Sequence, residues 1–429
     1  MKKTRREFVK MVGGAALGSG VMLAARGKAA QAKPKGVPSE PIKVGVICFM
    51  SGIAAPIGEP GWRATQIWVD DCNAAGGILG RKIELHLEEE TSAKETVEKF
   101  NKLTLQTKCD VIMGVISTGN CLAIAPVAED FGQLFLCWDG TTQKGVDETM
   151  PKTKYAFKSC NNEAEAVGGA ILTAKHFPYI RTVATINPDY SYGRNSAEAY
   201  KTVLKHFNPK AESVLDLWPK LGTADFTSHI AAIKKAKPDI LMSSLWSGDI
   251  PIFLKQAAAV GLYKEMKGCW IVAGLAHEIL EKAFTPEGMI LGYNSLFFNW
   301  TESWPLLKDF KKKYYTRFKG YPSYECDHAY FVLEAYKMAA EKAYAFTGKW
   351  PTKEQIAKVL PGIQVATPSG YRGYAQDKRM ICSYHMGITT HKNPYDFVTI
   401  DKVEVLSPVQ IQTPPGMKFH DWVRGWGKA

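Results

Sequence analysis

The sequence predicts an α/β protein built from doubly wound parallel sheets. Short β-branched runs alternate with amphipathic helical stretches, and the alternation occurs twice, on either side of residues 141–165. The 429 residues, of which 46% are hydrophobic and 22% charged, suit two or three globular domains. The repeated pattern therefore predicts two similar lobes.

The first half opens with a continuous β-branched run over residues 42–48, typical of a strand buried on both faces. A helical stripe follows over 61–75 and ends at Gly76 and Gly77. The same alternation then predicts strands at 83–87, 111–116 and 134–138, and helices at 97–105 and 122–131.

The second half repeats this order. Its apolar runs predict strands at 181–187, 212–218, 239–244 and 267–273, and helices at 196–207, 227–236 and 250–260. The C-terminal third is more helical, over 304–318 and 325–346, and ends in a tail interrupted by Pro and Gly. We expect this tail to cross between the lobes.

Residues 1–32 have the layout of a signal peptide. Arg5 and Arg6 precede a short apolar run rich in Gly and Ala, and Ala30-Gln31-Ala32 resembles a cleavage site. The paired arginines predict the twin-arginine export route. A membrane anchor is the alternative, but the apolar run is short for a bilayer span. We expect cleavage near Ala32, a polar linker over 33–40 and a mature protein in the periplasm.

The formal charge of +12 does not indicate a nucleic-acid binder. Residues 1–32 carry seven Lys and Arg against one Glu, so +6 of the charge lies there. Other basic residues, such as Lys234-Lys235 and Lys311 to Lys313, alternate with apolar positions on predicted helices. This pattern is typical of a solvated helix face.

The sequence contains no recognisable catalytic or metal-binding motif. Residues 76–82, GGILGRK, lack the ending of a phosphate loop, and HEILE at 277–281 lacks the second His of a zinc protease motif. None of the nine cysteines lies in a CxxC or zinc-finger spacing, and their pairing is left open. We therefore expect a protein without enzymatic activity, cofactor or metal.

Small polar residues follow two predicted strands of the first half. Ser117 and Thr118 follow one strand, and Asp139, Gly140 and Thr141 follow the next. Ligands of doubly wound folds lie outside the carboxyl ends of the strands, where helix N-termini attract anions. Ser117 and Thr118 suit helix capping equally well, so both interpretations stay open.

Five ordered stretches resemble the type I periplasmic solute-binding proteins of branched-chain amino acid ABC transporters. NAAGGILGRKIEL at 73–85 is the most recognisable, and the others lie at 41–58, 190–195, 223–241 and 253–262. The resemblance implies two α/β lobes joined by three crossovers, with 41–158 and 295–370 in lobe 1, and 159–294 and 371–429 in lobe 2. It also implies a monomer that closes on one small molecule and delivers it to an inner-membrane permease.

The resemblance also implies roles for individual residues. Thr118 matches the hydroxyl that binds the ligand carboxylate, and Asp139 and Thr141 fall where a loop holds the head group. Tyr192 and Trp246 match aromatic residues that close over the ligand. Trp138 would add a flat apolar surface near the cleft.

One departure from the family pattern affects the ligand. The loop over 274–278 reads GLAHE, in which only Glu278 is acidic, about four positions after the family's usual partner for the ligand ammonium. An α-amino acid would need Glu278, Asp139, Asp189 or Asp249 instead, because an unpaired buried ammonium costs several kcal/mol. We therefore weigh equally a branched-chain or hydrophobic amino acid and an aromatic or hydrophobic carboxylate. The alternative function is an amide or urea sensor on the same fold.

Overall fold

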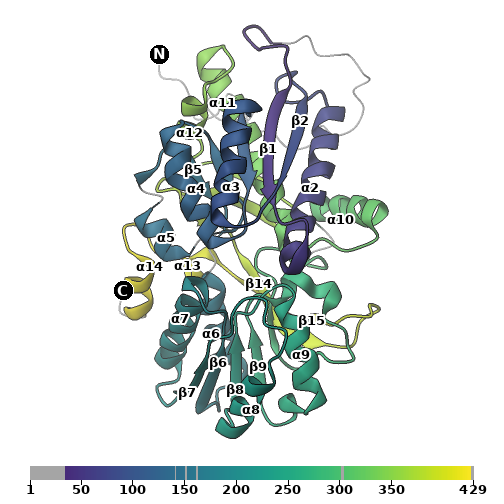
Figure 1. The fold of residues 1–429 in the computed structure, drawn as a ribbon, viewed down its shortest axis with the longest axis vertical. Helices are drawn as coiled ribbons and strands as arrows, with labels where there is room; N and C mark the ends of the chain where they lie inside the picture. The colour runs from purple at the N-terminus through teal and green to yellow at the C-terminus, as the bar shows by residue number, and fades with distance from the viewer. Residues whose placement is uncertain (1–33, 141, 150–151, 161–162, 301–303, 427–429) are drawn as a thin grey trace, which may run out of the picture.

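The computed structural model describes residues 34–140, 142–149, 152–160, 163–300 and 304–426. These residues form two α/β lobes stacked along the long axis of the molecule (Figure 1). The N-terminal strands lie in the upper lobe of that view. The expected signal peptide and Thr141 lie outside the described residues.

The sheet of the first lobe consists of the parallel strands β1 (Ile42–Cys48), β2 (Ile83–Glu89), β3 (Val111–Gly114), β4 (Phe135–Cys137) and β5 (Ala156–Lys158). Their order is β2-β1-β3-β4-β5. The inner strands are apolar and buried, because helices cover both faces of a parallel sheet. The chain winds in opposite directions on either side of β1 and β3, so the crevice beyond their carboxyl ends is the expected ligand position.

The helices of the first lobe are α2 (Ala55–Ala74), α3 (Ala93–Asn101), α4 (Thr118–Asp130), α5 (Gln143–Glu148), α10 (Pro305–Phe318), α11 (Tyr324–Thr347) and α12 (Lys353–Val359). Helix α2 begins before the expected residue 61 because Pro56 fits the first turn of a helix. Helix α11 packs against α2, and Trp68 Nε1 donates a hydrogen bond to Glu334 between them at 2.9 Å.

The sheet of the second lobe contains β6 (Thr182–Ile186), β7 (Glu212–Leu217), β8 (Ile240–Ser243), β9 (Lys267–Trp270), β10 (Ile290–Gly292), β14 (Tyr384–Thr390) and β15 (Thr399–Leu406). Its order is β15-β14-β10-β9-β8-β6-β7. The expectation of a wholly parallel sheet was wrong at one edge, because β14 and β15 are antiparallel. The short connection between them allows antiparallel pairing without a crossover helix.

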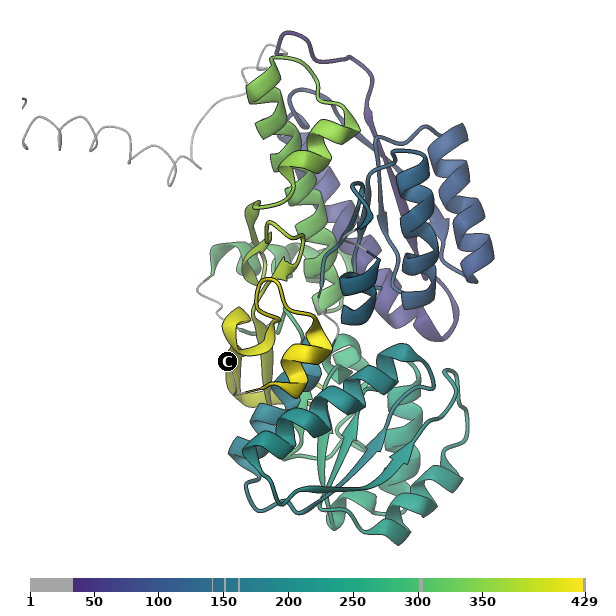
Figure 2. The same cartoon turned by 90° about the vertical axis from the view of Figure 1, so that its left-hand side faces the viewer.

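The helices of the second lobe are α6 (Ala164–His176), α7 (Ser191–Phe207), α8 (Thr227–Ala236) and α9 (Asp249–Ala259). A 3-10 segment over Ala273–Ile279 follows β9. The tail contains α13 (Pro408–Ile411), which packs on α6, and α14 (Phe419–Arg424), which packs on α7 and α5. Figure 2 shows this C-terminal segment on one side of the molecule, at the level where the lobes meet.

A small antiparallel sheet of β11 (Gln364–Thr367), β12 (Gly370–Tyr374) and β13 (Met380–Ile381) belongs with the first lobe. The Tyr374 ring packs against Phe157 and Phe331, whose ring centroids lie 5.3 Å and 5.1 Å away. Strand β12, which begins at the expected lobe boundary of residue 370, therefore packs with the first lobe. The chain passes between the lobes from β5 to α6, from β10 to α10 and from β13 to β14.

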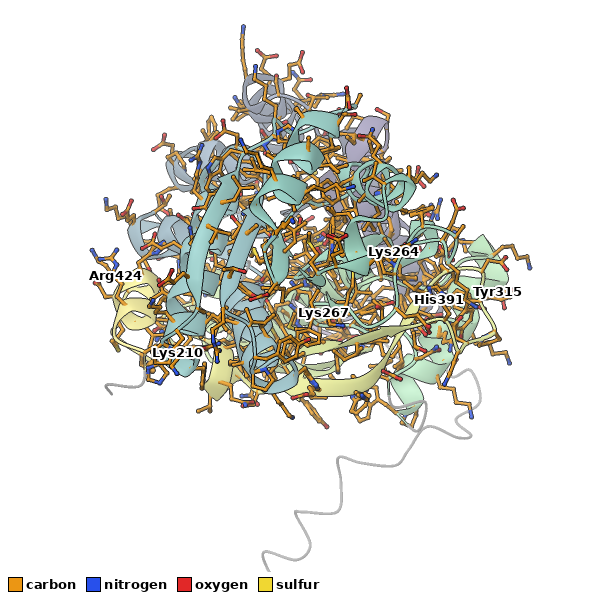
Figure 3. All side chains as sticks on the ribbon, turned by 90° about the horizontal axis from the view of Figure 1, so that it is seen from below. Lys210, Lys264, Lys267, Tyr315, His391 and Arg424 are labelled. Carbon is orange, nitrogen blue, oxygen red and sulfur yellow. The ribbon has the colours of Figure 1, made fainter. Side chains whose placement is uncertain are left out.

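The surface of the second lobe carries scattered basic side chains. Lys210, Lys264 and Lys267 lie at separate places on the face seen in Figure 3. Among the described residues, no helix is long and apolar enough to cross a membrane. The structure shows no disulfide bond among the cysteines it describes.

Candidate functional site

A narrow cavity lies where the two lobes meet. The cavity has a volume of about 30 Å³, which is enough for one or two water molecules. Both lobes and the segments between them contribute to its wall. The lining residues are Ile57, Ile116, Asp139, Glu165, Tyr190, Tyr192, Trp246, Val272, Asn294 and Tyr324.

Asp139 enters the cavity from the loop that follows β4. The neighbouring Gly140 permits a close approach of two loops, because a Cβ there would lie 2.5 Å from the carbonyl oxygen of Ser117. Cys160 Sγ donates a hydrogen bond to Asp139 Oδ1 at 2.6 Å. Burial raises the pKa of Asp139 above its ordinary value, and the charge of Lys158 opposes this shift. Asp139, which the sequence predicts to hold the ligand head group, therefore lines the cavity.

The backbone N–H groups of the loop that follows β3 bind the side chain of Glu90. Glu90 accepts hydrogen bonds from the backbone N–H of Ile116 at 2.8 Å and of Ser117 at 2.9 Å. The Asn120 side chain donates a third at 2.8 Å. Burial raises the Glu90 pKa to about 7, and these three donors limit the shift.

Ser117 and Thr118 do not line the cavity, although the sequence predicted them to bind the ligand. Helix α4 begins at Thr118, earlier than the expected residue 122, and Ser117 is its N-cap residue. Glu90 already uses the N–H groups near this helix start, where an external anion was expected to bind.

Tyr192 and Trp246, which the family resemblance expects to close over a ligand, both line the cavity. Trp246 Nε1 donates a hydrogen bond to the Tyr190 hydroxyl at 3.0 Å, and the Tyr190 and Tyr192 ring centroids lie 6.0 Å apart. These three residues, from the start of α7 and the loop after β8, form an aromatic wall on the second lobe.

Glu165 is the second carboxyl group of the cavity, and sequence reasoning missed it. The Tyr192 hydroxyl donates a hydrogen bond to Glu165 Oε1 at 3.1 Å. The other oxygen, Oε2, is buried and has no hydrogen-bond partner. Burial raises the Glu165 pKa well above its ordinary value, and the nearby Glu163 and Asp139 add to the effect.

Two further predicted site residues lie elsewhere. Trp138 is fully buried against helix α2, where its ring would lie 2.5 Å from a Cβ on Gly61. Glu278 is exposed and accepts a hydrogen bond from the Tyr321 backbone N–H at 3.0 Å. The structure therefore brings neither residue to the cavity.

The other proposed acidic partners, Asp189 and Asp249, do not line the cavity either. Asp189 pairs with Arg194 on the surface, and Asp249 accepts a hydrogen bond from the Gly222 backbone N–H. Asp139 and Glu165 are thus the acidic groups among the described lining residues, and none of those residues is Lys or Arg. This arrangement suits a small ligand that carries a cationic or hydrogen-bond-donating group.

Sequence reasoning also missed Tyr324 and Asn294 as lining residues. Tyr324 begins helix α11, and Asn294 follows β10 with a positive φ of 49°. Asn tolerates this left-handed conformation better than most residues, which was the available sequence signal in the GYNS stretch. Tyr324 gave no comparable signal.

Comparisons with known proteins agree with this architecture. A family model described as "Periplasmic binding protein" matches residues 41–391. The Leu/Ile/Val-binding protein homolog 7 of Brucella abortus is 26% identical over 317 residues, which cover 69% of this chain and 77% of the relative. Homolog 8 from the same species is 23% identical over 301 residues, with 66% and 71% covered.

Solved structures share the fold. A solute-binding protein of an ABC transporter from Rhodopseudomonas palustris BisB5, in complex with 3,4-dihydroxybenzoic acid, has a TM-score of 0.73 and 20% identity, and the match covers 85% of this chain and 98% of that one. A leucine-binding protein from Thermotoga maritima MSB8 has a TM-score of 0.72 and 19% identity, with 86% and 99% covered. Both likenesses confirm the predicted α/β fold of two lobes.

The family model covers most of the chain and ends inside the connection that follows β14. It therefore spans both lobes and the segments that join them. The family's members bind solutes rather than transform them, in agreement with the absence of catalytic motifs from the sequence. The chain belongs to the periplasmic binding protein family and is a binding protein, not an enzyme.

Proposed function

We propose that this protein is the periplasmic substrate-binding component of an ABC transporter, and that its ligand is a hydrophobic or branched-chain amino acid. The observation that carries the ligand class is the pair of carboxyl groups, Asp139 and Glu165, in a cavity whose described lining contains no Lys or Arg. A solute ammonium would add a positive charge at the cavity wall, where none of the described lining residues carries one. Glu165 Oε2, which has no partner, is the first candidate to receive it.

The aromatic wall suits the apolar body of such a ligand. Tyr190, Tyr192 and Trp246 offer ring faces and edges, and Ile57 and Val272 offer aliphatic surface. An aromatic contact contributes roughly 0.5–1.5 kcal/mol beyond area burial. The Brucella relatives carry Leu/Ile/Val-binding protein names, which supports this ligand class.

An amine-free aromatic carboxylate is the second candidate. Relatives in fold are complexed with 3,4-dihydroxybenzoic acid, 4-hydroxybenzoate and benzoate. In this chain such an anion would face two carboxyl groups without a lining cation. The charge of the cavity therefore favours the amino acid.

The proposed mechanism is hinge closure. An aromatic ring needs a cavity on the order of 150 Å³, so a solute enters only when the lobes move apart. The solute would then close the lobes by contacting Asp139 on one side and Tyr192 and Trp246 on the other. The closed monomer would dock on an inner-membrane permease after export and cleavage near Ala32.

A thermal-shift screen of the full chain tests the ligand class. We expect leucine or phenylalanine to raise the melting temperature, since a ligand at 100 times its dissociation constant adds about 2.7 kcal/mol of stability. Benzoate and 4-hydroxybenzoate should give no shift. A shift with the benzoates alone would overturn the amino-acid proposal.

The variant Glu165→Gln tests the role assigned to that carboxyl group. Loss of a charge-assisted hydrogen bond should weaken binding of the amino acid found in the screen by about 1.5–3 kcal/mol, measured by titration calorimetry. Glu278→Gln is the matched control, because Glu278 lies outside the cavity and should leave the affinity unchanged. Equal affinities in both variants would contradict the assignment.

A further inference from the structure

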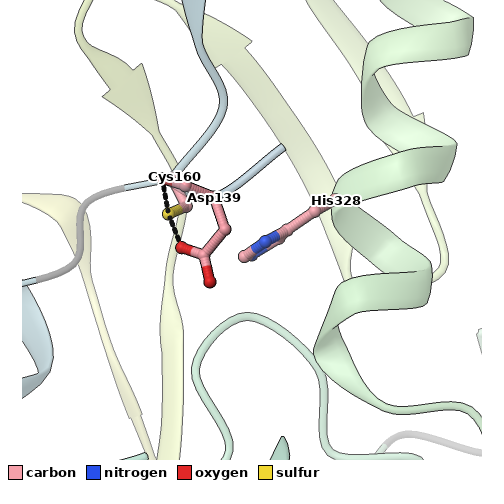
Figure 4. Close-up of side chains that lie close together, drawn as sticks. All are labelled: Asp139, Cys160 and His328. Carbon is pink, nitrogen blue, oxygen red and sulfur yellow. Dashed lines mark hydrogen bonds between the residues drawn. The ribbon is translucent and has the colours of Figure 1, made fainter. Parts of the chain in front are cut away.

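Three potential metal ligands from distant parts of the chain meet beside the cavity. Asp139 follows β4, Cys160 follows β5, and His328 lies in the first turns of α11. A carboxylate oxygen, the sulfur and a ring nitrogen lie within 4.8 Å of one another. Figure 4 shows the His328 ring directed at Asp139, with Cys160 on the other side of the carboxylate.

His328 is the unusual member of this trio. Its side chain is fully buried, yet neither Nδ1 nor Nε2 has a hydrogen-bond partner. A buried imidazole without hydrogen bonds loses those that it makes in water, which is unfavourable. Burial also lowers its pKa well below the ordinary value, so the ring is neutral and offers a lone pair. A group bound between the three residues would satisfy it.

We propose that Asp139, Cys160 and His328 bind a zinc ion at the edge of the solute cavity. Thiolate, imidazole and carboxylate donors are the set that tetrahedral Zn²⁺ takes in proteins. Zinc–ligand bonds of roughly 2.0–2.3 Å place neighbouring donor atoms about 3.5 Å apart. The widest separation in the trio must therefore shrink by roughly 1 Å, which side-chain rotation can supply.

The balance of charge and protons supports this site. The proton between Cys160 Sγ and Asp139 Oδ1 would leave for solvent when zinc takes its place, together with any second proton on the pair. A thiolate, a carboxylate and a neutral imidazole then balance Zn²⁺. The bound site would be neutral, as a buried position requires.

Glu325 lies beside His328 and would hold its ring in place for the metal. Its Oε2 lies 3.3 Å from His328 Nδ1, one helical turn away, and both carboxylate oxygens of Glu325 are buried without a hydrogen-bond partner. A histidine that binds zinc through one nitrogen usually donates its other N–H to a carboxylate. A small rotation would form this hydrogen bond and leave Nε2 for the metal.

The zinc site would border the solute cavity because Asp139 belongs to both. Three protein ligands leave the fourth position of a tetrahedral ion for water or for a solute oxygen. Glu165 would then remain as the carboxyl group that faces the solute ammonium.

Zinc binding to the chelator-treated full chain, without any solute, tests the proposal independently of the transported ligand. We expect one Zn²⁺ per chain in competition with a chromogenic chelator, and a thiolate-to-metal absorption band when Co²⁺ replaces it. Cys160→Ser and His328→Gln should each weaken zinc binding by more than 100-fold, and Glu325→Gln should weaken it by roughly 10–100-fold. Cys269→Ser, a buried cysteine in β9, should bind zinc like the unaltered chain.

Thermal melts of each variant separate lost zinc binding from lost folding. Should His328→Gln fail to fold, Cys160→Ser and the cobalt spectrum decide, because the absorption band requires a coordinated thiolate. Absence of stoichiometric zinc binding, absence of the cobalt band, or equal binding by Cys160→Ser would overturn the proposal.

Discussion

Glu165 lies in an environment that disfavours the ionised form of its carboxyl group. Its Oε1 accepts a hydrogen bond from the Tyr192 hydroxyl, and Glu163 and Asp139 lie nearby as like charges. Burial raises the Glu165 pKa well above the ordinary value, and these like charges add to the shift. A solute ammonium beside Glu165 would stabilise the ionised carboxylate and so lower its pKa. Solute binding and loss of the Glu165 proton are thus linked.

This linkage predicts the pH dependence of binding. The amino acid lowers the Glu165 pKa when it binds, so a proton leaves, and affinity should rise as the pH rises above the ordinary pKa range of a glutamate. Titration calorimetry in buffers of different ionisation enthalpy measures both the affinity and the protons released. In Glu165→Gln the pH dependence should become shallower. An affinity that falls with rising pH would contradict the assignment of this carboxyl group.

Some lining residues at strand ends could be predicted from the sequence, whereas those in the segments between the lobes could not. Asp139, Tyr192 and Trp246 follow apolar strands, and parallel strands direct their carboxyl ends to one edge. Glu165 and Tyr324 reach the cavity only because segments between the lobes pass it. No local sequence pattern predicts that these two residues reach the cavity.

The three residues of the proposed zinc site could not be predicted for the same reason. Their positions, 139, 160 and 328, have no short spacing that a motif could match. The expectation that the chain binds no metal rested on such spacings alone. Packing of α11 against α2 and β11 places His328 beside the two loop residues.

Among the elements, α8 ends with a residue in a costly conformation. Lys237, its exposed C-cap, has φ 47° and ψ 55°, in the left-handed region that favours glycine. Lys237→Gly should therefore stabilise the protein by about 0.5–1 kcal/mol in urea unfolding. Lys235→Gly, inside the same helix, is the matched control and should destabilise it by about 1 kcal/mol. Destabilisation by both variants would contradict the reasoning.

Long, strongly patterned elements were predicted well. Helix α8 matches its expected bounds, and β1 does as well. The short strands β5 and β10 and the pair β14 and β15 were missed, because their residues give no regular period and their pairing depends on distant strands. Helix α6 was missed because its Ala- and Gly-rich sequence carries little amphipathic signal.

At the scale of the whole molecule, Arg372 holds together the region where the lobes join. Its guanidinium donates to Asp327 Oδ2 at 2.5 Å and to the Ser159 carbonyl oxygen at 2.6 Å. Asp327 lies on α11, and Ser159 follows β5 in the first connection between lobes. Both charged side chains are buried, so the ion pair must remain complete.

Arg372→Met should destabilise the protein by about 3–5 kcal/mol, because it leaves the Asp327 carboxylate buried and unpaired. The double variant Arg372→Met with Asp327→Asn should recover part of this loss. Lys358→Met removes an exposed pair with Glu354 and should cost less than about 1 kcal/mol. Urea unfolding measures all three changes. A small effect of Arg372→Met would show that the pair does not hold this region.

The central claim is that Glu165, a carboxyl group of the cavity, selects a solute with an ammonium group. The most direct test is a calorimetric titration of the full chain with L-phenylalanine and with 3-phenylpropanoate, which has the same ring and carboxylate but no amine, and with the matched pair L-leucine and 4-methylpentanoate. We expect at least one amino acid to bind, and to bind at least about 10-fold more tightly than its amine-free partner, since a charge-assisted hydrogen bond contributes about 1.5–3 kcal/mol. Equal or tighter binding of the amine-free acids would contradict the account.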